Sequence, residues 1–105
     1  MKSRGTLQTS AGIIWLRFSD ARESYGAVVA SCECIDMPPR ARAVFHEHEQ
    51  RVLNQELSLL HHLQEEIHTY GLQVAWDGEP ERTEAFNVQL CEGEVSFRTS
   101  PLASQ

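Results

Sequence analysis

The sequence predicts an α+β fold in which one long helix packs across one face of a largely antiparallel sheet, in the order ββαβββ. Residues 41–70 contain neither Gly nor Pro, which favours an uninterrupted helix. Short segments on both sides of them alternate between apolar and polar residues, as strands do. The 105 residues are too few for two separate cores, so we expect one small domain over 1–105 with flexible ends at about 1–5 and 100–105.

The alternation of residue types predicts five strands, over residues 12–19, 25–35, 72–76, 86–90 and 95–97. In the first strand, Ile14, Leu16 and Phe18 share a face. The second strand has small side chains on one face, including Ala30 and Cys32, which would let a helix approach closely. The acidic segment 77–82 is expected to form a turn.

The predicted helix is bounded by Pro38 and Pro39 before it and by Gly71 after it. Projected at 100° per residue, its apolar side chains form one stripe. The stripe consists of Phe45, Val52, Leu53, Leu57, Leu60, Leu63, Ile67 and Tyr70. Two carboxylates, Glu49 and Glu56, interrupt it, although an unpaired carboxylate in an apolar contact is costly.

Two explanations would account for these carboxylates. In the first, arginine side chains pair with them inside the fold. In the second, the first half of the helix extends beyond the sheet and exposes them to solvent or to a partner. About 30 helical residues would extend roughly 45 Å, whereas a strand of eight to ten residues covers roughly 30 Å. This excess length favours a shared helix, as in a homodimer with two-fold symmetry, over a helix that crosses the sheet diagonally and projects a polar end.

The net charge of −6 disfavours nucleic acid and anionic membranes as partners and favours a protein with a basic surface. Eleven of the fifteen Asp and Glu residues lie in residues 46–105. The three cysteines cannot all pair within one chain, and neither a signal peptide nor a membrane span is recognisable. We therefore expect a cytoplasmic protein with free, buried thiols.

The long helix also carries all five histidines. His61, Glu65 and His68 lie at positions i, i+4 and i+7, which would suit a metal ion if further ligands were present. Their strip is expected to face water, which favours ordinary surface pairs. The sequence contains neither a nucleophile elbow nor a phosphate-binding glycine loop, so we expect neither catalysis nor a cofactor.

The sequence therefore favours a non-catalytic acidic interaction module of adaptor or inhibitor type, which self-associates or binds a basic protein through its long helix. The residues expected to bind the partner are Glu49, Glu56, Val52, Leu53, Glu79, Glu81 and Glu84. One alternative is a small enzyme that uses metal at His61, Glu65 and His68 or acid/base chemistry at Glu49 and Glu56. Another is a small-molecule-binding domain with a pocket between helix and sheet.

Overall fold

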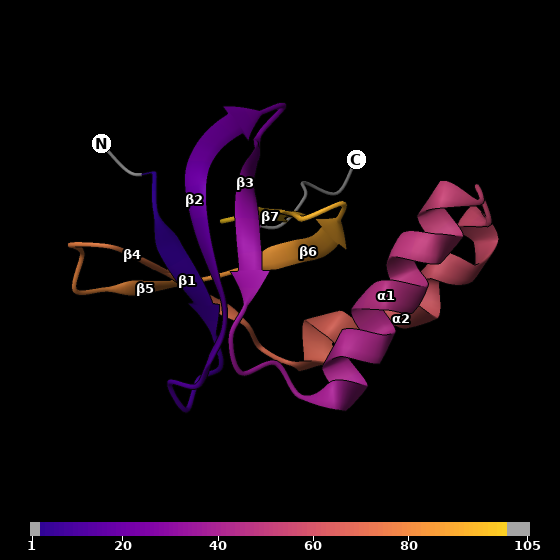
Figure 1. Ribbon diagram of the computed structural model, residues 1–105, viewed down its shortest axis with the longest axis horizontal. Coiled ribbons are helices and arrows are strands. Elements are labelled where there is room, and N and C mark those ends of the chain that lie inside the picture. Colours follow the sequence, from indigo (N-terminus) through magenta and orange to yellow (C-terminus); the bar gives the residue numbers. More distant parts are fainter. Residues whose placement is uncertain (1–2, 101–105) are drawn as a thin grey trace.

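The computed structural model describes residues 3–100, which form a curled antiparallel sheet with a pair of helices at one end (Figure 1). The strands are β1 (Gly5–Gln8), β2 (Ile14–Ser24), β3 (Ala27–Cys34), β4 (Gln73–Trp76), β5 (Arg82–Glu84), β6 (Phe86–Cys91) and β7 (Glu94–Arg98). The helices are α1 (Pro39–Leu53) and α2 (Leu60–Thr69), with the short 3-10 helix η1 (Leu57–Leu59) between them. The predicted α+β class and antiparallel sheet are confirmed. Of the predicted flexible ends, residues 1–2 and 101–105 lie outside the described residues, whereas Gly5 belongs to β1.

The sheet has the strand order β5-β4-β1-β2-β3-β7-β6, and it curls around an aromatic cluster. Trp76 of β4 and Phe97 of β7 are four strand spacings apart in this order, which would separate them by roughly 19 Å in a flat sheet. Their ring centroids are only 6.4 Å apart, and the Phe18 ring lies between them at 5.2 Å and 5.4 Å. The concave side of the curled sheet therefore forms the centre of the core.

The structure contains two strands, β1 and β5, that the residue alternation does not predict. β1 has only four residues, yet it pairs with β2 on one side and β4 on the other. A Cβ atom on Gly5 would lie 2.5 Å from the Ala75 carbonyl oxygen and 2.8 Å from the Phe18 ring, so the close packing of β1 requires glycine. β5 consists of three exposed residues that extend the predicted turn after β4.

The predicted single helix is instead two helices, because the chain reverses at residues 54–56. The Glu56 amide donates to the Arg51 carbonyl and the Gln55 amide donates to the Val52 carbonyl. This is the hydrogen-bond pattern of a Schellman C-cap, and Gln55 takes its left-handed position with φ 59. Glycine or asparagine normally marks that position, so the glutamine gives no signal of the break.

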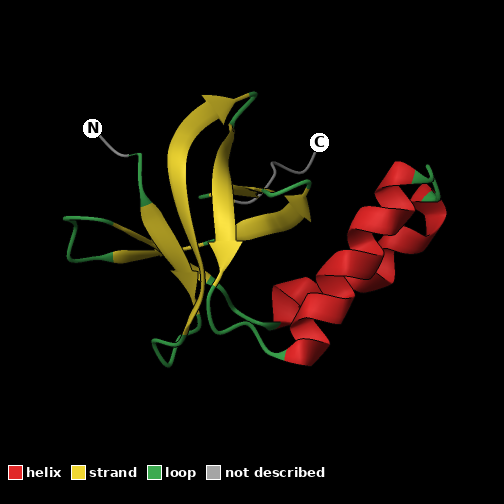
Figure 2. Ribbon diagram, viewed as in Figure 1, coloured by secondary structure: helices red, strands yellow, loops and turns green. Residues whose placement is uncertain are grey.

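The helices pack against each other and against β6, which differs from the predicted helix across the small-residue face of β3. Figure 2 shows α1 and α2 side by side beside the sheet. Ala41, Val44 and Phe45 of α1 and Ile67 of α2 are buried in the same core as the sheet aromatics. At the base of the helix pair, Trp15 meets Tyr70 edge to face, with ring centroids 5.1 Å apart.

The reversal at Gln55 predicts an unusual effect of glycine. Gln55→Gly should stabilise the protein by up to about 1 kcal/mol, because glycine adopts a positive φ without the steric penalty of a side chain. The matched control Gln50→Gly, inside α1, should destabilise it by roughly 0.5–1 kcal/mol. Urea unfolding measures both values, and destabilisation by Gln55→Gly to the same extent as the control would indicate a continuous helix.

Candidate functional site

The candidate site is a groove of about 340 Å³ between α2 and β6. Its floor is apolar and consists of Ile67, Leu72, Ala85 and Val88. Alternate residues of a strand point to opposite faces, so a hollow that Val88 lines together with Asn87 and Gln89 lies at the edge of β6. The sheet order ends at β6, so in the described part of the chain no strand pairs with this edge.

Polar side chains form the rim of the groove. Those of α2 are His61, Gln64, Glu65, His68 and Thr69, and those of β6 are Asn87 and Gln89. His61 Nε2 lies 2.6 Å from Glu65 Oε1. The His68 ring lies nearly parallel to the Phe86 ring, with the ring centroids 6.4 Å apart. Asn87 has φ 53 and lies in a β-bulge, which directs its side chain differently from a regular strand residue. An apolar floor with a few polar groups above it is typical of a binding site.

The predicted metal residues His61, Glu65 and His68 do line this groove, but they do not form a ligand set. Among residues 3–100, no group of three or more His, Cys, Asp or Glu side chains is arranged to hold a metal ion. The His61 ring pairs with Glu65, whereas His68 turns to Phe86. The geometry therefore gives the metal prediction no support.

Glu49 and Glu56, the carboxylates that interrupt the apolar stripe, both have partners within the chain. The Glu92 amide donates to Glu49 Oε2 at 2.7 Å, and Arg51 forms an ion pair with Glu56. With both carboxylates paired and the helix divided in two, neither feature favours an outside partner any longer. The two carboxylates also lie in separate surroundings, so the geometry does not bring them together for acid/base chemistry.

The predicted partner-binding residues fall into two distant groups. Val52 and Leu53 lie near the tip of the helix pair, where Leu53 is 51% exposed and Leu57 is 63% exposed. Glu79 and Glu81 lie between β4 and β5, and Glu84 ends β5. The β4–β5 turn and the helix tip are at opposite ends of the longest dimension of the molecule (Figure 1). One compact surface cannot contain both groups.

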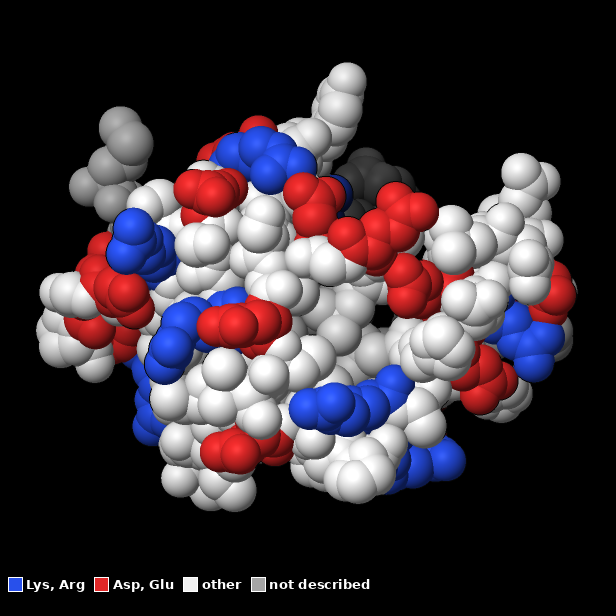
Figure 3. All heavy atoms as spheres, viewed as in Figure 1, with Lys and Arg blue, Asp and Glu red and all other residues white. Residues whose placement is uncertain are grey.

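Acidic side chains gather where the sheet meets the helix pair (Figure 3). Glu49, Glu92 and Glu94 lie around the Cys91 thiol, whose pKa is raised first by burial and then by these carboxylates. Arg22 forms an ion pair with Glu94 at 2.9 Å, so one arginine offsets one of the three carboxylates and the net charge of the cluster stays negative. This acidic cluster lies at the end of β6, next to the β6–β7 turn.

All three cysteines are free thiols. Cys32 and Cys91 are half-buried and Cys34 is exposed, so the prediction of three buried thiols was wrong for Cys34. Burial raises the pKa of the Cys32 thiol to about 11, which makes it a poor nucleophile. Cys34 borders a hollow of about 240 Å³ with His46 and Glu49, but no described contact joins this thiol to the His46 ring. The structure thus shows no activated cysteine among the described residues.

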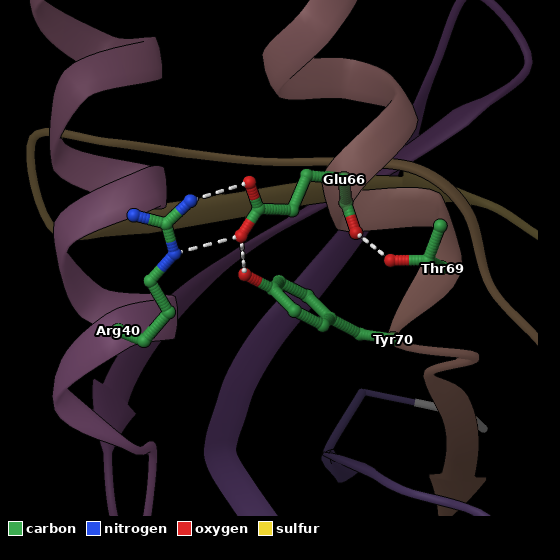
Figure 4. A network of polar contacts seen from close by, with 4 residues as sticks. All are labelled: Arg40, Glu66, Thr69 and Tyr70. Atoms are coloured by element: carbon green, nitrogen blue, oxygen red, sulfur yellow. Dashed lines mark hydrogen bonds and ion pairs between the residues drawn. The ribbon is translucent and has the colours of Figure 1, made fainter.

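A polar network fixes the base of the helix pair and hence one wall of the groove (Figure 4). Arg40 of α1 donates two hydrogen bonds to the Glu66 carboxylate, at 3.0 Å and 2.8 Å. The Tyr70 hydroxyl donates a third at 2.8 Å. The Arg40 bonds, followed by the Tyr70 bond, lower the pKa of Glu66. Burial, then Glu66, raises the pKa of Tyr70 to about 12.

His48 is a residue whose role the sequence did not reveal. It lies on the face of α1 that carries Ala41 and Val44, and it is only 1% exposed. Its Nε2 has no hydrogen-bond partner among the described residues, and burial lowers the pKa of the imidazole. The helical spacing of Ala41, Val44 and His48 could have indicated that His48 is buried. The predicted apolar stripe ran instead through Val52 and Leu53, so His48 was not assigned to the buried face.

A larger hollow of about 760 Å³ lies over β1, β2 and β3, where charged and hydroxyl side chains form most of its wall. Its charges are of both signs, with Arg4 and Arg17 beside Asp20, Glu33 and Asp77. These features suit a solvated sheet face more than a ligand site, so the groove at β6 is the better candidate.

No protein-family model, curated protein or solved structure matches this chain. Neither helix of the described residues has the length and apolar character needed to cross a membrane.

Protonation of Glu66 should loosen the helix pair at acidic pH. Its folded-state pKa lies below the ordinary value of 4.5, so its stabilising effect is present above that value and is lost as the pH falls through the folded pKa. Glu66→Gln should therefore reduce stability at about pH 7 and flatten its decline below about pH 4.5. Urea unfolding across this range tests the effect, with the exposed Glu65→Gln as control; equal pH profiles for both variants would contradict it.

His48 should contribute a second pH dependence, at higher pH. Its folded-state pKa lies below the ordinary 6.5, so the unfolded chain takes up the proton first and stability falls as the pH decreases through 6.5. His48→Gln should lessen this fall, whereas the exposed His46→Gln should leave it unchanged. Urea unfolding midpoints measured at about pH 7.5 and about pH 5.5 test this prediction. If the loss of stability between these pH values is the same in the His48 variant as in the parent, His48 is not its cause.

Proposed function

We propose that this chain is a non-catalytic protein-interaction module that takes up a segment of a partner protein in the groove between α2 and β6. The observation that supports the proposal is the groove itself, with its apolar floor and polar rim at an unpaired sheet edge. From His61 to His68 the helix wall advances about 10 Å, which suits a short chain segment.

Charge supports a partner segment that carries lysine or arginine. The chain has a net charge of −6, Glu65 stands on the groove rim, and Glu49, Glu92 and Glu94 lie at the end of β6. Complementary charge accelerates encounter and fixes orientation more than it adds affinity. The three free thiols fit a cytoplasmic location, which remains part of the proposal.

Two further functions have some support. The volume of the groove lies at the lower end of the range for small-molecule sites, so a small apolar ligand is the second candidate. The exposed Leu53 and Leu57 support self-association through the helix tip. Sedimentation at micromolar concentration tests self-association, and a monomer that is unchanged by Leu53→Ser would remove it.

Binding of short peptides tests the main proposal. The probes are fluorescently labelled peptides of roughly ten residues in which Val alternates with Lys, Ser or Glu. We expect the Val–Lys peptide to bind most tightly and to weaken with salt, because the attraction between opposite charges is screened. Reversing Glu79 and Glu81 to Lys should weaken it only at low salt, since these residues lie in the turn between β4 and β5 and do not line the groove.

Two matched variants separate the groove from the rest of the surface. Gln64→Trp places a large ring in the groove, whereas Gln50→Trp places the same ring on α1, where Gln50 is exposed and does not line the groove. Fluorescence anisotropy should show loss of binding for the first variant only. Absence of binding by every peptide, or equal loss in both variants, would contradict the proposed site.

A further inference from the structure

The two edges of the sheet differ in how well they are protected from pairing with another strand. β5 is three residues long and includes Arg82 and Glu84, and a short, charged edge resists pairing. β6 has six residues and contains no charged side chain and no proline. A bulge at Asn87 interrupts its first half, but Gln89, Leu90 and Cys91 pair regularly with β7. The edge at β6 is therefore the one open to an added strand.

The backbone groups that this edge offers follow from the β6–β7 hairpin. Its two-residue turn, Glu92 and Gly93, has φ values of 52 and 80, as in a type I′ turn, which makes Cys91 and Glu94 a hydrogen-bonded pair. Hydrogen-bonded and non-bonded pairs alternate along an antiparallel ladder, so the N–H and C=O groups of Leu90 point away from β7. The Gln89 N–H points to β7, so the Val88 C=O of the same peptide group also points away. The open edge therefore offers one N–H group, that of Leu90, and two C=O groups, those of Val88 and Leu90.

We infer that an extended segment of a partner protein adds to β6 as an eighth strand, with its alternate side chains directed into the groove. This inference rests on the proposed function and specifies how the partner is held. Backbone hydrogen bonds to the Val88 C=O and to the Leu90 N–H and C=O hold the segment, and apolar side chains at alternate positions contact the floor at Ile67 and Ala85. A lysine or arginine near one end meets the carboxylates of Glu49 and Glu92 at the end of β6.

Backbone methylation of the Val–Lys peptide tests this mode of binding. In an extended chain, successive N–H groups point to opposite sides, so methylating the nitrogens of all Val residues blocks one edge and methylating those of all Lys residues blocks the other. Strand addition predicts that one methylated peptide binds about tenfold or more weakly, the loss of two hydrogen bonds, while the other binds like the parent.

Amide hydrogen exchange on the full chain gives an independent measurement. Addition of the parent peptide should slow exchange of the Leu90 amide, and the Gln64→Trp variant should abolish this protection. If both methylated peptides bind like the parent and the Leu90 amide gains no protection, the segment docks by its side chains alone. In that case strand addition is refuted while the proposed function stands. If no peptide binds, both fail.

Discussion

The reversal of the chain at Gln55 is the constraint on which the helical part of the structure depends. Because α1 ends there in a Schellman cap, α2 returns antiparallel to α1 and reaches β6. Only this return brings Arg40 to Glu66, and only this return gives the groove its helical wall. A continuous helix would carry residues 57–70 away from the sheet, and Ile67 and Tyr70 would lose their contacts with the core. The cap stabilises this arrangement despite the positive φ of a glutamine, which shows that packing outweighs the local conformational preference.

The parts of the fold that the sequence predicted are those in which side-chain pattern and tertiary contact agree. Leu16 and Phe18 alternate with Arg17 because one face of β2 lies in the core, so the pattern reports the strand directly. β1 has no such pattern, because its position is set by pairing with β2 and β4 and by the space available at Gly5. The helix break was not predictable from composition, since residues 54–56 lack glycine and the break is held by backbone hydrogen bonds.

The candidate site was predicted only in part. The strip of His61, Glu65 and His68 was recognised and correctly expected to be exposed, but the sequence did not show that it borders a groove. The other wall comes from β6, and the contact of a helix with a strand nearly twenty residues away leaves no mark in local periodicity. Glu49 was correctly seen as unusual in an apolar stripe. Its partner, the Glu92 amide, is a backbone group, and no search for oppositely charged side chains identifies it.

The position of β1 between β4 and β2 has a consequence for how the chain folds. In the hydrogen-bonded order of the sheet, β4 and β5 connect to the other described strands through β1, which lies between β4 and β2. Gly5 pairs with Trp76, so this junction closes a loop that includes β2, β3 and both helices. Closing so long a loop costs entropy that local contacts cannot offset early, and folds dominated by distant pairings form slowly. We therefore expect β4 to pair late in folding, after β1 and β4, which are far apart in the sequence, have come together at Gly5 and Trp76.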